Sequence, residues 1–414
     1  MSDTLLHPHP VRRLPMAEFI AMMAMSFAVV AFSIDAMLPA LPEIAAEISA
    51  ADPNRAQLII TSFVLGMGIG TLFTGPVSDG VGRKPVIVFG AALYMLGAVM
   101  AWRAATIEAM FAARMLQGIG AAGPRVVGMA MIRDLYSGRQ MARLMSFIML
   151  VFTIVPALAP TIGAAIIMAA GWRAIFGAFI LFCGIATIWL VTRQAETLPR
   201  HERRSFRLAV LFEGIREIFT NRVVVLSLAA QSIGFAILFS TISSTQQIFD
   251  ETYGHGADFP LWFGGIALCS GTSGLVNAAL VGRLGMRYMI TTMFAIQVVI
   301  SGVVVASFLG GSLGQPAQFA VYVVWTAGIF FQTGLTLGNL NALAMEPMGH
   351  LAGLTASVTG SAATVIAVLL AIPIGLAFDG TPLPLMIGTF LLTLAALAIM
   401  LVMRWMDQRA RPVR

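Results

Sequence analysis

Two ionisable side chains lie inside long apolar stretches of this sequence, where a charge is costly. Asp35, in FSIDAMLPALPEI, is the one carboxyl group well inside such a stretch. A carboxyl group in low-dielectric surroundings can hold a proton near neutral pH and release it when water or a cation approaches. Arg114, in RMLQGIGAA, must face protein rather than lipid and find partners there. Both are therefore candidates for proton coupling, although Asp35 could instead be a polar cap satisfied by backbone groups, and Arg114 a packing anchor.

The apolar stretches predict an all-α integral membrane protein. The chain of 414 residues is 58% hydrophobic and 11% charged, whereas about a quarter of the residues of a soluble domain are charged. Crossing a bilayer takes about 20 apolar residues in a helix that pairs its own backbone groups. We predict twelve transmembrane helices, at residues 16–41, 56–78, 85–103, 107–132, 143–170, 174–192, 223–248, 260–282, 288–309, 318–344, 352–375 and 383–403.

The positions of the basic residues predict the orientation, because Lys and Arg are retained on the cytoplasmic side of short loops. If both termini are cytoplasmic, most of the 25 Lys and Arg residues fall in cytoplasmic segments, and only Arg55, Arg103 and Arg173 fall in the opposite loops. This bias predicts a multi-pass protein of the bacterial inner membrane with both termini inside. It also explains the net charge of +6 without nucleic acid as a partner.

One long polar segment divides the chain. We predict an N-terminal six-helix bundle at 1–192, a cytoplasmic linker at 193–222 with an amphipathic helix at 206–219, and a C-terminal six-helix bundle at 223–414. A weak internal repeat supports this division, since GPVSDGVGRK after the second span and AALVGRLGMR after the eighth align Gly82 with Gly285. Duplicated halves are a common transporter plan, with the substrate site between them near the midplane.

The turn after the second span resembles motif A of the major facilitator superfamily. Its pattern, G-x-x-x-D-x-x-G-R-K, comprises Gly75, Asp79, Gly82, Arg83 and Lys84. The glycines permit a tight turn, and the aspartate can engage a helix N-terminus or an arginine of the other half. The segment is therefore predicted to be a conformational latch. A basic residue is usual directly after the aspartate, and the glycine found there in this chain predicts a weaker latch.

The fourth span resembles motif B of the proton-coupled members of this superfamily. The pattern includes Arg114, Gln117 and Gly118. An arginine embedded at this depth must face the interior of the bundle, and the small residues around it let helices come close. The resemblance adds to the reading of Arg114 as a functional residue.

The fifth span resembles motif C, which is typical of antiporters. Pro156, Pro160 and Gly163 match the motif, whereas Ala159 and Ala164 stand where glycines are usual. Prolines inside a span weaken its hydrogen-bond ladder and bend it, which suits a pivot for alternating access.

Further short patterns narrow the resemblance to the Bcr/CflA type of drug:proton antiporter. They are D-x-x-L-P-A-L-P after Asp35, A-P-T-I-G in the fifth span, G-W-R-A-I-F before the sixth and A-G-L-T-A-S before the eleventh. The resemblance implies a monomer that exports small amphipathic molecules, such as chloramphenicol-like or bicyclomycin-like drugs or a metabolite, in exchange for protons. The proton gradient is the energy source and no cofactor is expected, because no G-x-x-x-x-G-K-[ST] loop is present.

Two other classes of protein stay open at this point. A proton-coupled symporter that imports a small metabolite is the alternative, because motif A and a buried carboxylate serve import equally well, although motif C favours export. An enzyme is not expected, and neither is a metal site, because all five histidines lie in loops or tails.

Polar side chains in other spans are candidates to line a substrate cavity with Asp35 and Arg114. They are Gln231, Gln246, Asn277, Gln332, Asn339 and Asn341. Arg125 departs from the family pattern, which has a small or apolar residue at this place in the inner half of the fourth span. It either snorkels to the cytoplasmic face or lines the cavity, where it would favour an anionic or zwitterionic substrate.

Overall fold

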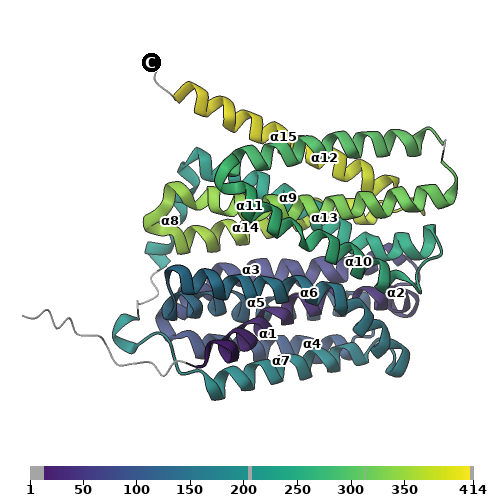
Figure 1. The fold of residues 1–414 in the computed structure, drawn as a ribbon. Coiled ribbons are helices and arrows are strands. Elements are labelled where there is room, and N and C mark those ends of the chain that lie inside the picture. The colour runs from purple at the N-terminus through teal and green to yellow at the C-terminus, as the bar shows by residue number, and fades with distance from the viewer. Residues whose placement is uncertain (1–13, 204–207, 312, 411–414) are drawn as a thin grey trace, which may run out of the picture.

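The computed structural model describes residues 14–203, 208–311 and 313–410, and in these ranges the chain is helical without any strand. The helices run side by side along one common direction (Figure 1). Their bounds are α1 Met16–Asp35, α2 Leu41–Ile48, α3 Leu58–Val81, α4 Arg83–Trp102, α5 Ile107–Leu135, α6 Gly138–Ala170, α7 Ala174–Arg193, α8 Leu208–Thr220, α9 Arg222–Gln247, α10 Phe259–Gly271, α11 Ser273–Leu284, α12 Met286–Leu309, α13 Gln315–Met345, α14 Ala352–Leu376 and α15 Leu383–Ala410.

The helices form two packed groups. In the first, α3 and α4 lie against α5, and α1 lies against α6 and α7. In the second, α9 packs against α13, α14 and α15, and α12 packs against α13 and α15. The groups meet where α3 contacts α14 and where α6 contacts α10, and Figure 1 shows them as a lower purple and blue layer and an upper green and yellow one.

The helices have the length and apolar character of a multi-pass membrane protein. Within the described ranges, nine helical segments are long and apolar enough to cross a bilayer, one of which covers both α13 and α14. The twelve predicted ranges fall on helices, with two differences. The range 16–41 continues past the end of α1 at Asp35 into a 3-10 helix and the first residue of α2, and 260–282 covers two successive helices, α10 and α11. The count of twelve crossings stays a prediction, because α5 and α6 lie outside the nine segments. The predicted amphipathic helix matches α8, although its first two residues, 206 and 207, lie outside the described residues.

The end of α1 is set by proline. Pro39 has no N–H group to donate to the carbonyl oxygen of Asp35, so the helix cannot continue past this residue. The chain instead turns through Ala36 and Met37 into a short 3-10 helix, Leu38–Ala40. Asp35 therefore occupies the last helical position before an irregular turn, deep in the bundle.

Glycine at two helix junctions reflects the internal repeat. Gly82 separates α3 from α4 with φ 108°, and Gly285 separates α11 from α12 with φ 81°. Both angles lie in the left-handed region, which favours glycine. The two residues that the sequence repeat aligns thus make the same kind of turn.

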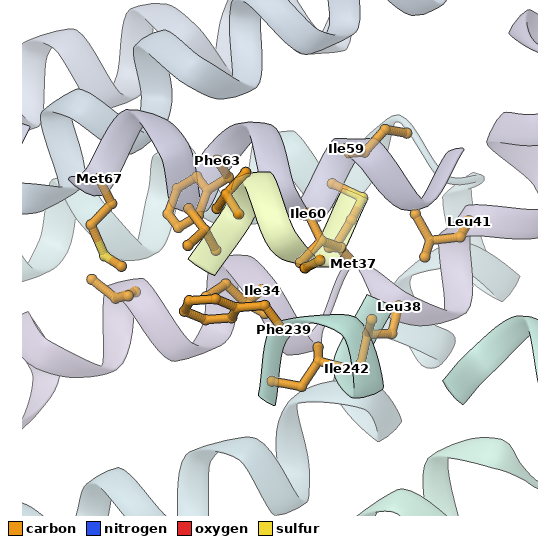
Figure 2. Packing of buried hydrophobic residues seen from close by; sticks show 14 of the residues in the cluster. Ile34, Met37, Leu38, Leu41, Ile59, Ile60, Phe63, Met67, Phe239 and Ile242 are labelled. Atoms are coloured by element: carbon orange, nitrogen blue, oxygen red, sulfur yellow. The ribbon is translucent and has the colours of Figure 1, made fainter. Parts of the chain in front are cut away.

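An apolar cluster joins the two groups near the end of α1. Figure 2 shows Ile34, Met37 and Leu38 beside Phe63 and Met67 of α3, with Phe239 and Ile242 of α9 reaching in from the second group. All seven are buried. This cluster surrounds the backbone on both sides of Asp35.

Candidate functional site

Asp35 is buried without a partner for its charge. Its side chain is 5% exposed, and no side chain in the described ranges donates a hydrogen bond to it or forms an ion pair with it. Its neighbours Ile34, Met37 and Leu38 belong to the apolar cluster of Figure 2. An ionised carboxylate here would lack compensation, so proton binding is the simplest way to remove its charge.

Arg114 is fully buried and held by neutral oxygen atoms. Its Nη1 donates to Gln117 Oε1 at 2.6 Å, and its Nη2 donates to the Ser33 carbonyl oxygen at 2.9 Å. Its guanidinium lies 4.4 Å from the ring centre of Phe63. The Tyr94 and Ser33 hydroxyl groups are hydrogen-bonded to each other, which adds α4 to the cluster. Arg114 thus ties α1, α3 and α4 to α5 through neutral groups.

Arg114 contacts a residue that lies near Asp35 in the sequence, but the charges of Arg114 and Asp35 are not paired. Arg114 binds the backbone of Ser33, two residues before Asp35. Two residues of α-helix correspond to a rotation of about 200°, so the Asp35 side chain leaves α1 on nearly the opposite side from that of Ser33. The link between the two predicted proton-coupling residues is therefore the backbone of α1.

Motif C packs on the turn that follows Asp35. A Cβ atom at Gly163 of α6 would collide with the carbonyl oxygen of Ala36, so only glycine fits this contact. Pro156 and Pro160 lie inside α6 just before Gly163. Because Pro160 has no N–H to bond the Pro156 carbonyl, the helical ladder is interrupted one turn before the contact. A bend in α6 would therefore act directly on the turn after Asp35.

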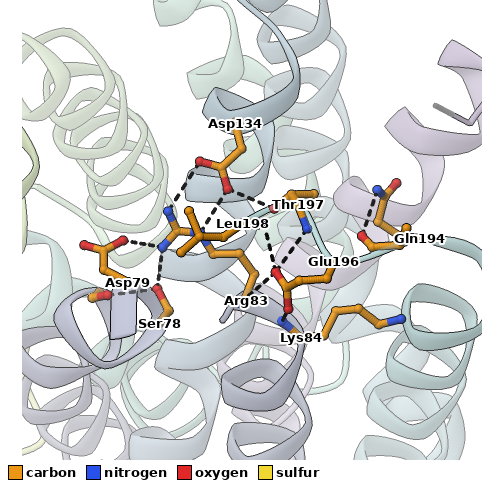
Figure 3. A network of polar contacts seen from close by, with 11 residues as sticks. Ser78, Asp79, Arg83, Lys84, Asp134, Gln194, Glu196, Thr197 and Leu198 are labelled. Carbon is orange, nitrogen blue, oxygen red and sulfur yellow. Dashed lines mark hydrogen bonds and ion pairs between the residues drawn. The ribbon is translucent and has the colours of Figure 1, made fainter. Parts of the chain in front are cut away.

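Motif A forms an ion-pair network inside the first group of helices, which Figure 3 shows. The guanidinium of Arg83 pairs with Asp79 and with Asp134, whose Oδ2 lies 3.0 Å from Nε, and it donates to Ser78 Oγ at 2.7 Å. Lys84 Nζ donates to the Val191 carbonyl oxygen at 2.8 Å. Asp79 therefore has its partner on its own turn, not in the second group.

Glu196, at the start of the linker, was missed by sequence reasoning. Its carboxylate accepts hydrogen bonds from the backbone N–H groups of Arg83 at 2.9 Å and Lys84 at 3.0 Å, in the first turn of α4 (Figure 3). A negative charge is favourable at this end of a helix. The chain separation is more than 100 residues, and no local spacing signals the contact.

Hydrogen bonds between the two groups gather at the end of the molecule away from the termini. Ser244 Oγ donates to Gln57 Oε1 at 2.8 Å, and Gln57 Nε2 donates to Gln247 Oε1 at 2.6 Å. Asn54 Nδ2 donates to the Phe378 carbonyl oxygen at 2.8 Å. These contacts were not predicted from the sequence, because amides near the ends of spans are common.

The predicted cavity amides fall into two sets. Gln231, Gln246 and Gln332 are buried and each has at least one amide atom without a hydrogen-bond partner in the described ranges. Asn339 Nδ2 donates to Asn277 Oδ1 at 2.7 Å, which pairs α13 with α11, and Asn341 is half-buried. The first set has free bonding capacity for a ligand, whereas the pair of Asn277 and Asn339 holds two helices together.

Arg125 lies on α5 and has no hydrogen bond to any of these amides among the described residues. Its Nη1 donates to Met67 Sδ at 3.6 Å, and the residue is exposed. An apolar groove of about 720 Å³ between α10 and α13, lined mainly by Leu261, Trp262 and Ile266, contains none of the predicted site residues.

Comparison with known proteins identifies the family. The family model described as Major Facilitator Superfamily matches residues 23–371. This chain belongs to the major facilitator superfamily. It is a multi-pass membrane protein of a transporter superfamily, and the predicted fold class and family are confirmed.

Relatives of this major facilitator protein carry transporter and drug-resistance names. An uncharacterized MFS-type transporter of Bacillus subtilis, YdgK, is 28% identical over 86% of this chain and 87% of its own. A bicyclomycin resistance protein homolog of Haemophilus influenzae is 29% identical over 80% of this chain and 82% of its own. The multidrug resistance protein MdtL of Salmonella heidelberg is 27% identical over 80% of each chain.

Solved structures share the fold at low sequence identity. The human organic anion transporter MFSD10 superposes with a TM-score of 0.64 at 16% identity, over 94% of this chain and 100% of that one. A D-xylose-proton symporter superposes with a TM-score of 0.72 at 14% identity, over 92% of this chain and 97% of that one. These likenesses concern the fold alone.

Proposed function

We propose that this major facilitator protein exports small amphipathic molecules in exchange for protons, by alternating access. The observation that carries the proposal is the buried, unpaired carboxyl group of Asp35 beside the contact between Ala36 and Gly163. A group that can bind a proton would then lie next to the helix that carries motif C. The drug-resistance names of the relatives support amphipathic compounds, such as bicyclomycin-like or chloramphenicol-like drugs, as cargo.

The coupling follows from the cost of the Asp35 charge. With a proton bound, Asp35 fits its apolar surroundings and the turn after α1 can stay packed on α6. When the proton leaves, the carboxylate requires water or a polar partner, which favours an arrangement that opens this region. Movement of the turn presses on α6 at Gly163, one turn after the break at Pro160. Proton release and helix bending thereby become parts of one step.

The proton gradient supplies enough free energy for this exchange. Each charge that moves down 100 mV yields about 2.3 kcal/mol, and every 1.4 kcal/mol corresponds to a tenfold substrate gradient. The transporter therefore needs no cofactor as an energy source. In this proposal it is a monomer in the bacterial inner membrane, with both termini in the cytoplasm. It performs no chemical conversion, and its partners are the small-molecule substrate, protons and membrane lipid, with no nucleic acid among them.

The test compares purified wild type with Asp35→Asn in proteoliposomes that carry an internal pH dye and an imposed proton gradient. Asp52→Asn is the matched control, because Asp52 is an exposed carboxylate at the end of the molecule away from the termini. Chloramphenicol is added on one side, and proton and drug fluxes are recorded together.

We expect proton and drug to move in opposite directions in wild type and in Asp52→Asn. We expect no coupled flux in Asp35→Asn. Fluxes of proton and drug in the same direction would overturn export and establish a symporter. Full coupling in Asp35→Asn would overturn Asp35 as the proton site.

A further inference from the structure

Arg125 faces the interior of the bundle, not lipid. The exposed residues Glu108 and Met115 mark the side of α5 that faces away from protein. At 100° per residue, Arg125 points roughly 100° away from that side. Gly118, two turns earlier on nearly the same side, packs on α3, and Gly128, three residues later, packs on Phe27 of α1, whose ring a Cβ would meet at 2.8 Å. The Arg125 side chain therefore lies between α1 and α3.

The guanidinium of Arg125 reaches toward the middle of the membrane. Its one polar contact among the described residues is Met67, the tenth residue of the 24-residue helix α3. At 1.5 Å per residue, Met67 lies roughly 14 Å from one end of α3 and roughly 21 Å from the other. Side chains on a helix lean toward its N-terminus, and α5 begins at the end of the molecule away from the termini, so this direction carries the charge inward. This direction favours the alternative in which Arg125 lines the cavity over the one in which it snorkels to the cytoplasmic face.

The charge of Arg125 has no counterion in the protein. No carboxylate in ranges 14–203, 208–311 and 313–410 lies within ion-pair distance of it, and Met67 Sδ is a weak acceptor. Asp35 cannot neutralise it, because Asp35 lies near the level of Arg114, which is 11 residues and roughly 16 Å away along α5. The residue is nevertheless exposed, so a small ligand can reach it.

We propose that Arg125 binds the anionic group of the substrate, a carboxylate, sulfonate or phosphate carried on an otherwise apolar body. Guanidinium is the side-chain group best matched to such oxyanions, which it binds through two parallel hydrogen bonds. The apolar neighbours Met67 and Phe27 suit the rest of an amphipathic molecule. This inference rests on the proposed export function and specifies the class of its substrate.

The test measures binding of two probes that share one scaffold, neutral chloramphenicol and its anionic hemisuccinate ester, to purified protein in a non-ionic detergent by calorimetry. Arg125→Gln removes the charge and keeps much of the volume, and Arg125→Lys keeps the charge without the planar fork. Arg103→Gln is the matched control, because Arg103 is an exposed cation at the far end of α4. Monodisperse elution of each variant establishes that it is folded.

We expect wild type and Arg103→Gln to bind the hemisuccinate at least tenfold more tightly than chloramphenicol. Arg125→Gln should lose this preference and leave the affinity for chloramphenicol within about threefold, with Arg125→Lys between the two. Tighter binding of neutral chloramphenicol by wild type, or an unchanged preference in Arg125→Gln, would overturn the inference.

The two proposals fail separately. In one outcome, Arg125→Gln leaves proton-coupled export of chloramphenicol unchanged, and wild type shows no preference for the hemisuccinate. That outcome would overturn the role of Arg125 and leave the exporter proposal standing. In the opposite outcome, binding of the hemisuccinate depends on Arg125, but proteoliposomes show no coupled proton flux. That outcome would support the role of Arg125 and overturn proton-coupled export.

Discussion

Gly163 of α6 lies directly against the carbonyl oxygen of Ala36, the residue that follows Asp35. The contact joins the candidate proton site to the helix whose prolines interrupt its ladder. It is close enough that the smallest added side chain would force α1 and α6 apart. The chemistry at Asp35 and the shape of α6 are therefore mechanically connected through one backbone contact.

Gly163→Ala should reduce transport at least tenfold while the protein still folds. The added methyl group collides with Ala36, and overpacking of this kind costs about 1–3 kcal/mol. The measurement is drug efflux from proteoliposomes. Gly184→Ala in α7 is the control, because a Cβ there meets nothing within 4 Å, and it should transport normally. Normal transport by Gly163→Ala would show that the contact does not carry coupling.

Arg114→Gln should lower thermal stability. The substitution leaves the Ser33 carbonyl oxygen and the Gln117 amide without their donor, and each unsatisfied buried group costs about 1–3 kcal/mol. We expect the melting temperature in detergent to fall by several degrees, and Arg103→Gln to leave it unchanged. A variant with unchanged stability and abolished proton flux would instead assign Arg114 to proton transfer.

Glu196→Gln should loosen the start of the linker from α4. The neutral amide can still accept one hydrogen bond, but it loses the favourable interaction of a charge with a helix N-terminus, about 0.3–1 kcal/mol. Limited digestion with trypsin should then cut faster after Arg200. The control is Glu202→Gln, an exposed neighbour outside the motif A network. Equal digestion rates in both variants would show that Glu196 does not hold the linker.

Gln57→Ala should open the end of the molecule that lies away from the termini. It removes the hydrogen bonds to Ser244 and Gln247 that join the two groups of helices. Hydrogen exchange measured by mass spectrometry should increase in residues 53–57 and 248–252. Gln315→Ala is the control at the same end, since the hydrogen bond of Gln315 in the described ranges stays within its own group, at the Thr252 carbonyl oxygen. Unchanged exchange in Gln57→Ala would mean that other contacts close this end.

The sequence predicted the features of this structure that depend on amino-acid composition and on residues close together in the chain. Apolar content and helix length predicted the all-α membrane fold. The end of α1 at Asp35 was not predicted, although Pro39 lies four residues later and cannot continue the hydrogen-bond ladder. The break between α10 and α11 at Thr272 was not predicted, although it falls in a short stretch of small and polar residues, SGTS at 270–273.

Contacts between distant segments were the part that could not be predicted. The pairing of Glu196 with the first turn of α4, and the bond between Ser33 and Tyr94, each join segments more than 60 residues apart. The direction of Arg125 was left open for the same reason, since it depends on where α1 and α3 lie around α5. The roles of Asp35 and of the buried glutamines stay predictions.

The inward direction of Arg125 also bears on the electrical behaviour of transport. If the exported molecule is a monoanion that leaves as one proton comes in, both movements carry positive charge inward, and two charges cross in each cycle. A membrane potential of 100 mV would then supply about 4.6 kcal/mol per cycle, twice the value for a neutral molecule. The same exchange with a monovalent cation would move no net charge. If Arg125 on α5 binds the anionic group of the substrate, we therefore expect transport to respond to voltage more strongly than export of a neutral molecule or a monovalent cation would.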